Sequence, residues 1–249
     1  MQTILYIWNM KYPNSPIVEA VFDIQVQGLE DLTQEDIEKL HFKFEEKYPL
    51  KKKTLNILGN IEVKNGIGIS NETQTKFKGL IFSNKKNDRQ VQFRIDGFTL
   101  NFLFPYTEWD NFYNEALSLW EIYYHNLKPN HINRIGLRYI NKINIPLPFD
   151  SFQEYITNMP PIPKSMPQLY NGFFMQIQVP CQDNNYNVVI TETIETPTKD
   201  IVPFILDIDV FKEINNDFEF NDFNYMRSMK NLIFEDFITD KTRNLFSYE

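Results

Sequence analysis

The sequence predicts an α+β protein in which a curved antiparallel sheet carries helices on one face. Two observations support this fold class. Stretches in which apolar and polar residues alternate, the period of a strand with one buried face, recur along the chain and are separated by apolar stripes at helical spacing. The order of these elements is similar in residues 1–129 and 130–249. We therefore expect two α+β repeats that share one continuous sheet, with a pseudo-two-fold duplication.

The first half reads as a strand, a helix, four strands and a long helix. Residues 17–27 alternate, and Thr33–Asp36 has the pattern of a capping box before a helix expected over 33–48. The lysine triplet 51–53 is expected to form a solvated turn. Further turns are expected at 65–66 and 70–73. The four strands are expected at 55–63, 77–83, 90–95 and 98–104, and the long helix begins near Trp109 and ends before Pro129.

The second half repeats this order with one strand fewer. It opens on His131–Pro146, which alternates over its whole length, and a short helix is expected over 150–157. Residues 159–167 hold four prolines, which exclude a helix interior and a central strand, so this segment is expected to be a loop. A final helix is expected over 223–237, with Lys230 on its apolar line extending its charge to solvent. Between the loop and this helix, three strands are expected, at 173–179, 187–193 and 203–210.

The two opening strands of the halves carry complementary charges. Glu19 and Asp23 lie four residues apart on one strand, and Arg134 and Arg138 lie four apart on the other. An antiparallel register that places Glu19 opposite Arg138 also places Asp23 opposite Arg134, so two cross-strand ion pairs are expected. Two alternatives stay open: the arginines are unrelated surface charges, or they clamp a phosphate or carboxylate. These four residues are the structural or binding candidates of the sequence.

Composition and motifs argue against several function classes. The chain has 249 residues and a net charge of −8, which is the wrong sign for a protein that neutralises phosphates, so nucleic acid ranks last among the partners. No phosphate-binding loop, zinc-binding motif or catalytic constellation is readable, so no enzyme activity, cofactor or metal is expected. Asp207 and Asp209 share a strand face and would hold a cation only if another acid, such as Glu192, faced them.

The expected location is the cytoplasm. A single cysteine, Cys181, is typical of a reducing compartment. The first residues lack the charged start and the apolar run of a signal peptide, and no apolar stretch of about 18 residues occurs, so no membrane association is expected.

Two stretches resemble a sporadically distributed family of uncharacterised bacterial proteins of roughly this length. Pro13–Ile24, read as PNSPIVEAVFDI, is similar to the opening motif of that family, and NRIGLRYINKI at 133–143 is similar to its central motif. The family offers no catalytic residue to carry over. Its patchy distribution implies an association with defence or toxin–antitoxin-like genes. The order of elements also resembles TATA-binding-protein-like and helix-grip folds, a likeness that implies no function.

We therefore expect a non-enzymatic, cytoplasmic protein-binding module, an accessory or neutralising component of a bacterial antiviral defence or toxin–antitoxin-like system. Its partner would be another protein, bound through the free face of the sheet or through the loop at 159–167. A homodimer in which a second copy buries the free face of the sheet is a further alternative. The first alternative is a small-molecule or nucleotide sensor whose pocket is lined by Trp109, Trp120, Tyr124 and Phe173. The second is a nucleic-acid-binding accessory protein.

Overall fold

The predicted α+β class with a large antiparallel sheet is confirmed. The computed structural model describes residues 12–64, 67–104, 106, 108–181, 185–215 and 219–247. In these residues nine strands form one sheet with the order β2-β3-β4-β5-β1-β6-β9-β8-β7. The strands are β1 (Ile17–Gln27), β2 (Leu50–Lys64), β3 (Ile67–Ser83), β4 (Arg89–Arg94), β5 (Gly97–Leu103), β6 (His131–Pro146), β7 (Phe174–Pro180), β8 (Tyr186–Ile194) and β9 (Ile201–Glu213). The helices are α2 (Gln34–Glu38), α3 (Trp109–Leu127), α4 (Asp222–Phe237) and α5 (Asp240–Asn244), with 3₁₀ turns η1 (His41–Lys43) and η2 (Phe152–Glu154).

The two opening strands, β1 and β6, are neighbours at the middle of the strand order. Lys142 donates its backbone N–H to Pro16 at one end, 2.8 Å away, and Asn130 donates to Gln27 at the other, 3.0 Å away. Residue numbers rise along one strand as they fall along the other, so the pair is antiparallel. Every second residue of β1 from Ala20 to Val26 is buried, as the alternation predicts.

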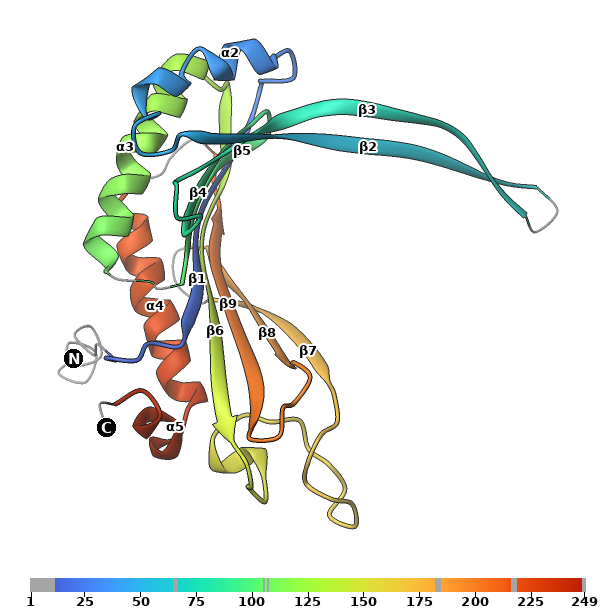
Figure 1. The fold of residues 1–249 in the computed structure, drawn as a ribbon, viewed down its shortest axis with the longest axis vertical. Coiled ribbons are helices and arrows are strands. Elements are labelled where there is room, and N and C mark those ends of the chain that lie inside the picture. Colours follow the sequence, from blue (N-terminus) through green and yellow to red (C-terminus); the bar gives the residue numbers. More distant parts are fainter. Residues whose placement is uncertain are drawn as a thin grey trace. The chain divides into compact units, whose positions relative to one another are not determined.

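The chain divides into two compact units that cut across β1 and β6. Unit 1 comprises residues 1–22, 102–107 and 135–249, and unit 2 comprises residues 23–101 and 108–134. These bounds differ from the predicted halves 1–129 and 130–249, because each unit takes one end of each central strand. In unit 2, α2 and α3 lie on one side of the strands; in unit 1, α4 lies along β9 (Figure 1).

The helix expected over 33–48 is much shorter. The capping box of Thr33 and Asp36 is present and begins α2, which ends at Glu38. His41 Nε2 lies 2.7 Å from the carbonyl oxygen of Tyr48, so the chain folds back on itself as a 3₁₀ turn and successive tight turns. The periodicity of this stretch reflects burial of its aromatic residues rather than a continuous helix.

Strands β2 and β3 are longer than predicted. Lys51–Lys53 belongs to β2 and pairs with Leu80–Phe82, and Ser70–Thr73 lies within β3, so neither segment is the expected turn. The register of this pair shifts at two β-bulges, one of them at Gly59–Asn60 opposite the polar stretch that the sequence suggested as a turn. The predicted turn at 65–66 lies outside the described residues.

The helix expected over 150–157 is reduced to η2. Its backbone bonds instead to the end of α4: Thr157 N–H donates to Phe237, Thr239 N–H donates to Tyr155, and Ile156 bridges Ile238. The predicted loop at 159–167 contains no helix or strand.

Lys230 does not extend to solvent. Its side chain is buried in α4, and its Nζ lies 3.9 Å from the centre of the Tyr139 ring. Burial, and to a smaller extent the nearby Arg227 guanidinium, lower the pKa of Lys230 to about 7. Among the described residues, none of the helices combines the length and the apolar character needed to cross a membrane.

Candidate functional site

Three polar side chains of unit 2 converge on Asp23. Arg94 Nη2 donates to one carboxylate oxygen of Asp23 at 3.1 Å, and Arg134 Nη1 lies 3.4 Å from the other. Thr99 donates its hydroxyl to Asp23 at 2.6 Å, and the Arg94 guanidinium contacts the same hydroxyl. Arg134 therefore lies beside Asp23, as the register from the sequence predicts, but Arg94 completes the cluster from β4.

Arg138 has a different main partner from the one that the register predicts. Its Nε donates to Asp207 Oδ1 at 2.8 Å and its Nη2 to Asp207 Oδ2, so the two side chains form a bidentate pair across β6 and β9. This hydrogen bonding raises the pKa of Arg138, and Glu19 adds only a weaker electrostatic attraction. The hydrogen bonds of Arg138 therefore go to Asp207, a partner that the register did not predict, and Glu19 attracts the same guanidinium.

These contacts favour a structural role for the charged residues at the centre of the sheet. Each of the two arginines that the sequence singled out lies against an aspartate of its own unit. An arginine that clamps a ligand phosphate needs its donors free for that ligand. A phosphate clamped by these arginines would therefore compete with Asp23 and Asp207 for them.

The acids considered for a cation site do not face one another. Glu192 pairs across the strands with Leu206, which is buried in the core, whereas the neighbouring Asp207 contacts Arg138 on the opposite face. In the described part of the chain, no group of His, Cys, Asp or Glu could hold a metal ion. The structure therefore separates the residues that the cation hypothesis brought together.

Glu192 itself is a buried acid that lacks a hydrogen-bond partner among the described residues. Its side chain is 0% exposed, and neither carboxylate oxygen accepts a hydrogen bond there. Burial raises the pKa of Glu192 to about 7. The aromatic rings of Tyr170, Phe173 and Phe204 form a chain in the same unit, with ring centres 5.1 and 6.1 Å apart, and Tyr170 is electrostatically coupled to Glu192.

Strand β7 is the most exposed strand whose side chains the structure describes throughout. It ends the sheet, and among the described residues it pairs only with β8, so one of its edges is open there. Its sequence, FMQIQVP, has no charged residue. Phe174 is 70% exposed on one face, and Ile177 and Val179, which pair with the buried Ile190 and Val188, are 41% and 45% exposed on the other. Apolar side chains therefore flank the open edge on both faces.

The Pro-rich loop precedes β7 and adds two more exposed apolar side chains, Met166 and Leu169. The loop is tied down at Tyr170, whose hydroxyl donates to the Pro160 carbonyl and whose ring packs against Phe152 at 5.5 Å. We call β7 together with loop residues 159–169 the β7 surface. The sequence predicted the loop and the strand separately; the absence of charge in residues 174–180 was the signal that could have singled out this edge.

Of the four aromatic residues expected to line a ligand pocket, Trp120 and Tyr124 lie together on α3, with ring centres 5.4 Å apart. Trp120 is buried against Phe98 and Tyr123 in unit 2, with ring centres 5.8 and 5.5 Å away, so its surroundings are filled by other rings. Phe173 belongs to unit 1 and packs against Tyr170. A polar hollow of about 400 Å³ does occur in unit 2, where Asp23, Arg94, Asp96, Lys78, Asn133 and neighbouring β1 residues line it.

No protein-family model, curated protein or solved structure matches the chain.

Proposed function

We propose that this protein is a non-enzymatic protein-binding module that docks its partner on the β7 surface. The observation that carries the proposal is an open edge strand without charge. Soluble proteins protect such edges with lysines, prolines, bulges or covering segments, because unpaired backbone N–H and C=O groups invite another strand. An edge left open, flanked by exposed apolar side chains, fits a partner that covers it.

The chemistry of the β7 surface describes the partner. An extended segment that pairs with β7 would gain main-chain hydrogen bonds, and its alternate side chains would meet Phe174 on one face and Ile177 on the other. Met166 and Leu169 extend the apolar contact beyond the strand. The partner is therefore an extended, mainly apolar protein segment, with specificity set by side chains spaced two residues apart.

The biological setting of this proposal comes from the family resemblance of the two sequence motifs. On that basis we place the protein as an accessory or neutralising component of a bacterial defence or toxin–antitoxin-like system, acting in the cytoplasm. The neighbouring genes of the native host test this placement, since a gene for a toxin, nuclease or other defence protein beside this one would support it.

We also propose that the sheet arose by duplication, as in the TATA-binding-protein-like folds that the sequence resembles. Support comes from the strand order, in which β5 follows β1 on one side of the centre and β9 follows β6 on the other, each with a helix after it along the chain. A superposition of residues 1–129 on residues 130–249 that does not align these strands and helices would argue against duplication.

The experiment that tests the proposed function compares two variants of equally exposed residues. Ile177→Lys places a charge at the open edge, and Leu232→Lys places the same charge on α4; both native side chains are 41% exposed. Tagged wild-type protein and both variants would be purified from the native host. We expect one stoichiometric partner with the wild type and with Leu232→Lys, but not with Ile177→Lys. Absence of a partner, or equal loss in both variants, would contradict the proposal.

A further inference from the structure

Strands β2 and β3 continue past the rest of unit 2 as a two-stranded arm. Their pairing runs from Leu50 with Ser83 to Lys64 with Ile67, whereas β4 pairs with β3 only between Gly79 and Ser83. We call the described residues of this hairpin, 50–64 and 67–83, the arm. Among the described residues, its outer part, residues 55–64 and 67–78, has no third strand beside it (Figure 1). Ten residues of extended chain span roughly 33 Å.

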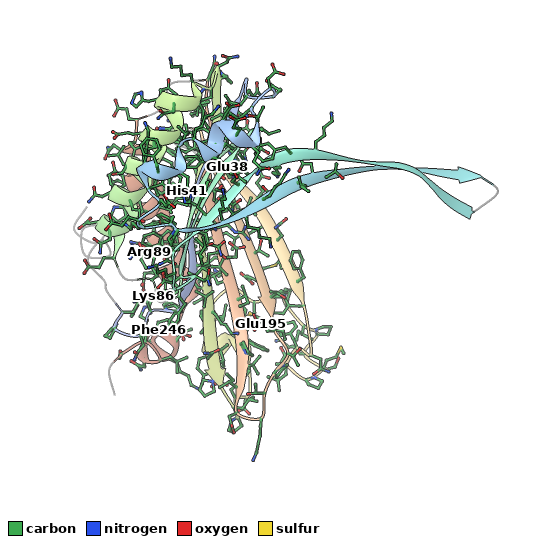
Figure 2. The ribbon with its side chains drawn as sticks, turned by 45° about the horizontal axis from the view of Figure 1, so that its top comes forward. Glu38, His41, Lys86, Arg89, Glu195 and Phe246 are labelled. Atoms are coloured by element: carbon green, nitrogen blue, oxygen red, sulfur yellow. The ribbon has the colours of Figure 1, made fainter. Side chains whose placement is uncertain are left out.

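The lysines of this hairpin reverse the charge of the chain locally. Residues 50–83 contain six lysines and two glutamates, a net charge of +4, which leaves −12 for the remainder of a chain whose total is −8. Two of the lysines are paired at the root of the arm: Lys51 with Glu38 at 2.9 Å and Lys78 with Asp96 at 3.7 Å. Figure 2 shows Glu38 on the short helical segment beside this root.

Three other lysines are exposed where the arm begins. Lys52, Lys53 and Lys76 form no ion pair with the described residues, although the Nζ of Lys53 lies 5.7 Å from the centre of the Phe77 ring. Lysines and β-bulges on an edge are the devices that prevent another protein strand from pairing with it. This edge of the sheet is therefore guarded against strand addition, unlike the β7 edge.

A basic hairpin whose edge disfavours pairing with another strand is better suited to bind a polyanion than to bind a protein strand. The major groove of duplex DNA admits a two-stranded β-ribbon, and one helical turn measures about 34 Å, close to the length of the outer part of the arm. The acidic remainder of the chain would be repelled by phosphates, which confines contact to the arm. A two-stranded hairpin alone is marginally stable in water, so it gains most from a ligand that holds both strands.

We propose that the β2–β3 arm binds double-stranded nucleic acid, with its exposed lysines contacting the phosphate backbone. The proposal is independent of the β7 surface. It reverses the low rank that net charge gives to nucleic acid, because the charge that matters is that of the arm.

The test uses fluorescence anisotropy with short labelled DNA and RNA duplexes over a range of salt concentrations. The arm variant is Lys53→Gln with Lys76→Gln. The matched control is Lys85→Gln with Lys86→Gln, two exposed lysines of unit 2 on the turn between β3 and β4, at the other end of β3; Figure 2 labels Lys86. All four side chains are exposed, so neither variant should perturb the fold, and thermal unfolding checks this.

We expect the wild type and the control to bind a duplex with an affinity that falls as salt rises. If both arm lysines contact phosphates, the arm variant should bind roughly 10- to 100-fold more weakly at about 0.1 M salt, and its log–log salt slope should be smaller by about 1.8. No binding by the wild type at low salt, or equal losses in both variants, would overturn the proposal. So would an arm variant that keeps its duplex affinity but loses self-association in sedimentation, since that result assigns the arm to an acidic protein surface.

Discussion

Glu192 predicts that the folded state loses stability as pH rises. Burial raises its pKa to about 7 in the folded protein, against 4.5 in an exposed side chain. The folded state holds this proton more tightly than the unfolded state does, and the protonated Glu192 therefore stabilises the fold. The stabilisation is complete below about pH 4.5 and is lost as pH rises through about 7. The difference of about 2.5 in pKa, at about 1.4 kcal/mol for each pH unit, corresponds to about 3 kcal/mol.

Urea unfolding at about pH 5 and about pH 8 measures this effect. Replacing Glu192 with Gln keeps the volume and removes the ionisation, so the stability of Glu192→Gln should not fall between the two pH values. This variant should exceed the wild type in stability by up to about 3 kcal/mol at the higher pH. Glu195→Gln is the control, since Glu195 lies close in sequence but is exposed and pairs with Lys142 at 2.6 Å. If Glu192→Gln kept the pH dependence of the wild type, the assignment of Glu192 as a buried, unpartnered acid would be wrong.

Three further changes test other parts of the structure. A double-mutant cycle of Asp23→Ala and Arg134→Ala should give a coupling energy of about 1 kcal/mol in chemical unfolding, and a value near zero would remove this cross-strand pair from the account. Lys230→Met should stabilise the protein by about 1 to 2 kcal/mol at neutral pH, because burying an ammonium group costs more than the nearby aromatic ring returns; a loss of stability would show that the charge is well compensated. Gly97→Ala should lower the midpoint of thermal unfolding by several degrees, since Gly97 has φ +157° and a Cβ there would lie 2.4 Å from the Ile24 carbonyl oxygen; an unchanged midpoint would contradict this geometry.

The central strands could be predicted from the sequence because one face of each is buried. The alternation in residues 17–27 and 131–146 marks that face, and both strands have these bounds in the structure. Helix lengths were harder to predict. Apolar spacing over 33–48 is helical, yet a side-chain contact from His41 to the Tyr48 backbone turns the chain instead. The spacing of apolar residues shows which of them are buried, but it does not show a hydrogen bond between a side chain and the backbone.

Contacts between the candidate residues could be predicted only where the sequence itself indicates that their two strands pair. Asp23 and Arg134 belong to the two central strands, so their contact follows from charge spacing. Asp207 reaches Arg138 from β9, and Arg94 reaches Asp23 from β4, which requires the strand order of the whole sheet. The open edge at β7 is likewise a property of strand order, because only the two outermost strands of a sheet lack a second neighbour.

Hydrogen exchange on the purified complex is the most direct test of docking at β7. The backbone amides of residues 174–180 would be compared in the free protein and in the complex with the partner captured by the wild type. Docking by strand addition predicts that these amides become protected while those of the arm are unchanged. Protection that leaves residues 174–180 unaffected would contradict it.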